Sequence, residues 1–167
     1  MNKHFFYILM VSLITTSCNN KSKNEPFKTQ PSLKKVITPI KSLDTSNLTN
    51  SYWVQRINLN NGDKWQANPE TTKEIHAMLK ILKETEAFKV EDYQKLGKHL
   101  NKSKTVIITS CTMEGLAHDN LHVYLLPLIE KIHYLSRAST MEEGQIIKEN
   151  IQTHLEMYNS YFDTNGY

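Results

Sequence analysis

Four side chains that can bind a soft metal ion lie close together in the sequence. Cys111 and Met113 supply a thiol and a thioether, and His118 and His122 supply two imidazoles on the other side of Gly115. The histidines are four residues apart, so on a helix both imidazoles project from the same face. This set suits copper better than zinc, because methionine is a poor zinc ligand. The pattern therefore predicts one copper ion bound by all four side chains.

The same four residues also fit a domain that binds no ligand. Cys111 shares a helical face with Leu100 and Ile107, as a small hydrophobic core residue would. Two histidines at this spacing also occur by chance on many helices, where they hydrogen-bond to backbone or water. A metal-binding protein and a structural or interaction protein without a ligand are therefore both compatible with the sequence.

Other chemistries have less support. The chain contains no G-x-S-x-G, phosphate-loop or H-E-x-x-H motif, so we do not expect an enzyme. The absence of C-x-x-C-H excludes covalent c-type haem, whereas noncovalent haem between histidine and methionine is an alternative. Its candidate axial ligands are His76, Met78, His154 and Met157. The net charge of +3 is too small to indicate a nucleic-acid partner.

The N-terminal segment has the features of an export signal. Lys3 and His4 precede an apolar run from Phe5 to Ile14, which ends in the sequence Thr-Thr-Ser-Cys at residues 15–18. A helix of this length reaches only about 15 Å, roughly half of a bilayer core. The run is therefore interpreted as the core of a signal peptide and not as a membrane span.

The end of this leader resembles the lipobox of bacterial lipoproteins, in which a small residue precedes a cysteine that is lipidated and becomes the new N-terminus. Thr16 and Ser17 fit that pattern, whereas Thr15 stands in place of the usual leucine. The resemblance implies lipidation at Cys18 and a domain held at the cell envelope, outside the cytoplasm. An ordinary signal peptide with a chance cysteine is the alternative. Residues 111–127 are also similar to a stretch in small bacterial lipoproteins, which implies no activity.

Lipidation at Cys18 would change the chemistry of the remaining chain. Cys111 would be its only thiol, so no intramolecular disulfide could form. A thiol in an oxidising compartment is easier to explain if it coordinates a metal. Removal of residues 1–17 takes away Lys3 and no acid, which leaves the mature chain near +2.

Composition and hydrophobic period divide the chain into four parts. Residues 1–17 are predicted to be the signal peptide, and residues 18–50, rich in Pro, Lys, Ser, Thr and Asn, are predicted to be a lipid-anchored flexible linker. Residues 51–67 are predicted to form a β-hairpin. A three-residue loop with Gly62 at positive φ is preferred to a two-residue Asn61-Gly62 turn, because it places Ile57 opposite Trp65.

Residues 68–163 contain four amphipathic segments with short connections. Their start signals are Asn68-Pro69, the acidic first turn after Val90, the region of Ala117, and a capping box at Thr140-Met141-Glu142-Glu143. Short connections imply antiparallel neighbours. The predicted fold is therefore mainly α, an antiparallel four-helix bundle preceded by a short β-hairpin.

Pro127 falls inside the third predicted helix. It removes one backbone hydrogen bond and frees the carbonyl of Val123, so a kink is expected one turn past His122. Such a bend either opens space beside the histidines or only adapts the helix to its neighbours.

Overall fold

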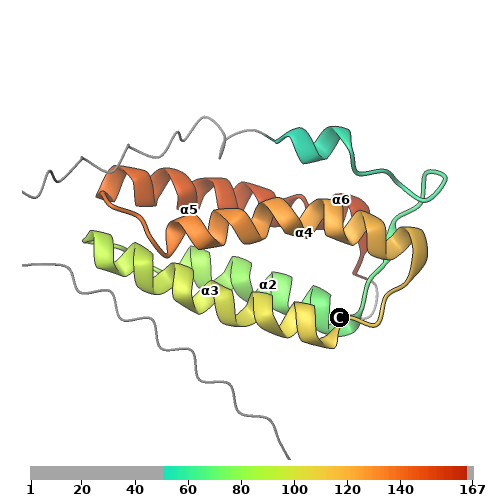
Figure 1. Ribbon diagram of the computed structural model, residues 1–167, viewed down its shortest axis with the longest axis horizontal. Coiled ribbons are helices and arrows are strands. Elements are labelled where there is room, and N and C mark those ends of the chain that lie inside the picture. Colours follow the sequence, from blue (N-terminus) through green and yellow to red (C-terminus); the bar gives the residue numbers. More distant parts are fainter. Residues whose placement is uncertain (1–50, 165–167) are drawn as a thin grey trace, which may run out of the picture. The chain divides into compact units, whose positions relative to one another are not determined.

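The computed structural model describes residues 51–164, which form a mainly helical domain (Figure 1). The long helices within this range are α2 (Pro69–Glu84), α3 (Val90–Ser110), α4 (Gly115–Leu135) and α5 (Met141–Glu156). The short elements are the 3₁₀ helix η1 (Tyr52–Gln55), helix α6 (Tyr158–Tyr161), and the strands β1 (Trp65–Gln66) and β2 (Phe162–Asp163). The predicted signal peptide, Cys18 and the linker of residues 18–50 lie outside the described residues.

The helices begin close to the positions that the sequence signals predict. Pro69 is the first residue of α2, and the Asp92 carboxylate in the first turn of α3 accepts the Lys89 backbone N–H at 3.3 Å. The Thr140 hydroxyl accepts the Glu143 N–H at 3.1 Å, so the predicted cap of α5 is confirmed. The Glu143 carboxylate reaches back one residue further than expected, to the Ser139 N–H at 2.8 Å.

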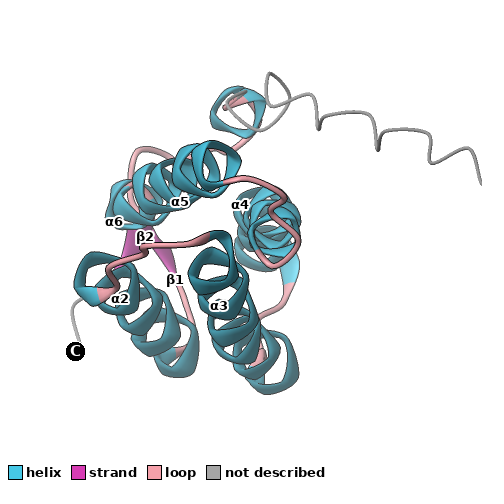
Figure 2. Ribbon diagram, turned by 90° about the vertical axis from the view of Figure 1, so that its left-hand side faces the viewer, coloured by secondary structure: helices cyan, strands magenta, loops and turns pink. Residues whose placement is uncertain are grey.

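The long helices lie side by side around a hydrophobic core (Figure 2). Helix α2 contacts α3 and α5, and α4 contacts the same two helices from the other side. The residues that the helical period places on one face are the residues that the core buries. Those with no exposed surface include Ile75, Met78, Leu82, Leu100, Leu121, Tyr124, Leu135, Ile147 and Ile151.

The predicted β-hairpin of residues 51–67 is not formed. Trp53 lies in η1 instead of a strand, and β1 pairs in parallel with β2, so that Trp65 lies opposite Phe162. Both tryptophans are buried against the helices, at 1% and 8% exposure. Packing on a core formed by distant segments has therefore overridden the local alternation that predicts a strand.

The turn of the predicted hairpin is present, in the form that was not preferred. Asn60 and Asp63 exchange two backbone hydrogen bonds of 2.8 and 3.0 Å. Asn61 has φ 55° and Gly62 has φ 101°, which is the pattern of a two-residue turn. The three-residue loop was wrong, because it was chosen to place Ile57 opposite Trp65 across a ladder that does not form.

The last predicted helix is shorter than expected. It was predicted to continue to Phe162, but α5 ends at Glu156, and Phe162 has extended backbone, φ −118° and ψ 138°. Tyr158 and Phe162 are nevertheless fully buried, as their apolar pattern predicts. No helix within residues 51–164 is long and apolar enough to cross a membrane.

Candidate functional site

The four predicted copper ligands do not lie together. Cys111 and Met113 are half-buried and pack against the hydrophobic core. His118 and His122 lie on α4 with their ring centroids 4.2 Å apart and their planes tilted by 55°. Within the part of the chain that the structure describes, no group of three or more His, Cys, Asp or Glu side chains is placed to hold a metal ion. Cys111, His118 and His122 therefore do not form one metal-binding group, whereas the two histidines are adjacent.

The connection between α3 and α4 is bonded to the start of α2. The Thr112 N–H donates to the Asn68 side-chain oxygen at 3.1 Å, and the Asn68 amide donates to the Thr112 hydroxyl at 2.6 Å. Cys111 itself is extended, with φ −67° and ψ 122°, and ends α3 instead of continuing it.

A cavity of about 200 Å³ lies between η1 and α4, next to the histidine pair. Its walls are Tyr52, Trp53 and Arg56 on one side and His122, Val123, Leu126 and Pro127 on the other. One buried water needs only about 15 Å³ by a comparable measure, so the space is large enough for a small organic molecule. We call this space the η1–α4 cavity. Arg56, His122 and Leu126 are exposed, so the cavity opens to solvent.

The η1–α4 cavity lies beside Pro127, which is inside α4. Proline has no N–H, so the Val123 carbonyl cannot accept the usual helical hydrogen bond from that residue. Both Val123 and Pro127 line the cavity. An opening beside the histidines was one of the two consequences expected of this proline, and the structure has an opening at this place.

A buried polar pair lies behind this cavity, between α4 and α5. The His154 Nε2 lies 3.0 Å from the Tyr124 carbonyl oxygen, and the His154 Nδ1 lies 3.4 Å from the Lys131 Nζ. Because a carbonyl can only accept, Nε2 carries the proton and Nδ1 accepts from the lysine. The Trp53 ring stacks on the imidazole, with centroids 4.3 Å apart.

Burial shifts the ionisation of both members of this pair. His154 is 2% exposed, and desolvation, with a smaller effect from the charge of Lys131, lowers the pKa of His154 to about 3. Lys131 is 5% exposed, and desolvation lowers its pKa to about 8. His154 is therefore neutral at neutral pH, and Lys131 loses its proton more readily than an exposed lysine.

Sequence reasoning did not identify Lys131. A signal was available, because Lys131 lies seven residues after Tyr124 and three after Leu128, on the apolar face of its helix. A charged residue at such a position has to be buried with a partner or has to reach solvent. His154 was correctly placed on the inward face of the last long helix.

The arrangement of His154 argues against the haem alternative. Both ring nitrogens already have partners, so an axial bond to iron would require one of these contacts to break. Met78 has no exposed surface and is part of the hydrophobic core. Ligation of haem by His154 or Met78 would therefore require the buried core to rearrange.

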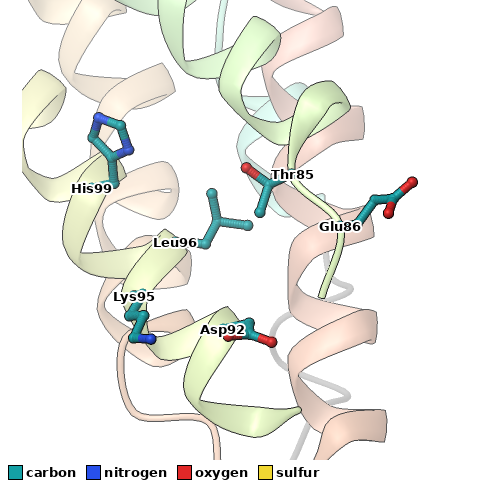
Figure 3. A pocket seen from close by; sticks show the side chains of 6 residues that line it. All are labelled: Thr85, Glu86, Asp92, Lys95, Leu96 and His99. Atoms are coloured by element: carbon teal, nitrogen blue, oxygen red, sulfur yellow. The ribbon is translucent and has the colours of Figure 1, made fainter. Parts of the chain in front are cut away.

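A second cavity, of about 230 Å³, lies where α2 ends and α3 begins (Figure 3). Its polar side chains are spread around the opening and do not converge on one point. Asp92, which lines it, already accepts the backbone N–H groups of Phe88 and Lys89 as the cap of α3. The acid is therefore explained by the helix start, and the η1–α4 cavity is the stronger candidate.

Comparisons with protein-family models, with curated proteins and with solved structures find no match to this chain.

Proposed function

We propose that the protein is an exported lipoprotein whose helical domain is held at a membrane surface, outside the cytoplasm, by lipid on Cys18. The proposal is carried by the leader, in which an apolar run ends in Thr-Thr-Ser-Cys. The polar residues 19–24 that follow suit a tether. As a flexible chain, residues 19–50 would hold the domain roughly 30 Å from the bilayer.

We infer that helices α2 to α5 form an antiparallel four-helix bundle in this protein. The inference is supported by contacts between each long helix and the next along the chain, by contacts between α5 and α2, and by connections of only a few residues. Such a bundle would serve as a non-enzymatic binding or interaction module of the envelope.

Replacement of Cys18 by serine tests the anchor. We expect the wild-type chain to incorporate labelled fatty acid and Cys18→Ser to incorporate none, because the variant lacks the thiol that would carry the lipid. Cys111→Ser is the matched control, since it removes the other thiol and should leave the labelling unchanged. Labelling of Cys18→Ser at the wild-type level, or no labelling of the wild type, would contradict lipid anchoring through Cys18.

A second function is supported by the adjacency of His118 and His122. We propose that these two imidazoles bind a copper ion, with water in the remaining positions. Because imidazole nitrogens are the donors that lie together, Cu²⁺ is favoured by its place at the head of the divalent affinity order. The softer four-ligand site, with Cys111 and Met113, would require the connection after α3 to leave Asn68.

Titration with Cu²⁺ against a competing chelator tests this metal site. We expect His118→Ala and His122→Ala each to weaken binding by at least about tenfold, because each removes one of two chelating nitrogens. Affinity should fall as the solution is acidified, because protons compete with the metal for the imidazole nitrogens. His133→Ala removes an exposed histidine from the same helix and serves as the control. If all three variants bind as the wild type does, the pair is not a metal site.

A further inference from the structure

We propose that the η1–α4 cavity binds a small monocarboxylate with an apolar body. The proposal goes beyond lipid anchoring and does not depend on it. It rests on two observations about the residues that line the cavity: their charge and the apolar character of the remaining wall.

Two side chains that line the cavity can donate hydrogen bonds, and no acidic side chain lines it with them. Arg56 and His122 line the cavity, and neither Asp nor Glu is among its lining residues. Arg56 forms no ion pair with any described residue. A guanidinium is a planar fork that matches the two oxygens of a carboxylate, so an exposed, unpaired arginine beside a cavity favours such an anion.

Trp53 lines the cavity and supplies a signal that reports on it. Its side chain is 1% exposed, and its indole Nε1 is buried without a hydrogen-bond partner among residues 51–164. The Trp65 Nε1 differs, because it donates to the Asn58 carbonyl at 2.5 Å. A molecule bound against Trp53 would therefore change the surroundings of one indole N–H and not of the other.

The apolar part of the wall indicates what kind of molecule would carry the carboxylate. Val123, Leu126 and Pro127 give the cavity an apolar side, and Tyr52 adds an aromatic ring. Leu126 is 62% exposed, so part of this apolar wall faces solvent. Small-molecule sites combine an apolar wall with a few polar groups that fix orientation. The cavity therefore suits an apolar acid better than a sugar, a phosphate or a cation.

The bound state would place the carboxylate at the Arg56 end and the hydrocarbon body along Leu126 and Pro127. Trp53 would report binding, because its side chain lines the cavity and its ring stacks on His154. His122 is shared with the proposed copper pair. The test is therefore made without metal, in a chelator, so that failure of one proposal does not affect the other.

The experiment follows the two indole N–H resonances in ¹⁵N-labelled mature chain carrying Cys18→Ser, with EDTA present. Sodium benzoate and sodium hexanoate are the probes, and Trp65→Phe assigns the two signals. We expect a saturable shift of the Trp53 Nε1 signal with either acid, and no shift of the Trp65 signal. Benzyl alcohol has the same ring without the charge and should bind at least about tenfold more weakly.

The chain offers a matched pair of variants, because Arg56 and Arg137 are its two arginines and both are exposed. Arg56→Gln should weaken the binding of both acids by at least about tenfold, and Arg137→Gln should leave it unchanged, although both remove one positive charge. An unchanged Trp65 signal shows that each variant is folded. The proposal is overturned if neither acid shifts the Trp53 signal, if both variants behave alike, or if benzyl alcohol binds as well as benzoate.

Discussion

Gly97→Ala is expected to destabilise the domain by about 3 kcal/mol, the upper end of the usual range for overpacking. A Cβ atom at Gly97 would lie 2.4 Å from the backbone nitrogen of Ser136 and 2.8 Å from the carbonyl carbon of Leu135. These are backbone atoms at the end of α4, so the clash can be relieved only if α3 and α4 move apart. Urea unfolding of the mature chain measures the change.

Whether Gly97→Ala lowers or raises the free energy of unfolding distinguishes a packing clash from a gain in helix propensity. Alanine in place of glycine inside an exposed helix stabilises it by about 1 kcal/mol. Gly144→Ala is the comparison, because its Cβ would meet the ring of Tyr93 at 2.5 Å, and a side chain can turn away where a backbone cannot. We expect a smaller loss there. A Gly97→Ala variant as stable as the wild type would show that α3 and α4 are not in close contact at this residue.

Acid should unfold the domain through His154. Its pKa is about 3 in the folded chain because of burial, against about 6.5 for an exposed histidine. Between these values the unfolded chain binds a proton that the folded chain does not, so the stabilising effect is complete above pH 6.5 and is lost as the pH falls. The slope is about 1.4 kcal/mol per pH unit, which amounts to roughly 3 kcal/mol between pH 7 and pH 4.5.

Two histidine variants isolate this effect from the titration of carboxylates. His154→Gln keeps an amide N–H that can donate to the Tyr124 carbonyl, but it has no proton to gain, so its unfolding free energy should depend much less on pH over this range. His133→Gln changes an exposed histidine and should retain the wild-type slope. Equal slopes for wild type and His154→Gln, measured by urea unfolding at several pH values, would exclude His154 as the acid-sensitive group.

The helical part of the fold was predictable because its determinants are local. Pro69 at the start of α2, the cap at Thr140 and the buried faces of the long helices all depend on residues within a few turns of one another. Strand pairing was not predictable in the same way. Trp65 pairs with Phe162, at the other end of the domain, and no local pattern indicates that partner.

At the candidate sites, too, local features were predictable and long-range contacts were not. The adjacency of His118 and His122 follows from a spacing of four residues on one helix and was predicted. For Cys111 the sequence left two alternatives, a metal ligand and a core residue, and the structure packs it against the core, next to a connection that hydrogen-bonds to Asn68, 44 residues from Thr112. The η1–α4 cavity was foreseen only through Pro127, since its second wall comes from a segment that was expected to be a strand.

The short parallel pair of β1 and β2 has a consequence for the order in which the domain assembles. It joins Gln66 to Asp163, which are 97 residues apart, through two residues of each strand. Closing so long a loop carries an entropy penalty that two residue pairs are too few to offset. The pair is therefore favourable only after α2 and α5 have docked and brought its strands together. Each helix can form from local contacts, so this closure should come last in folding and open first in the native state.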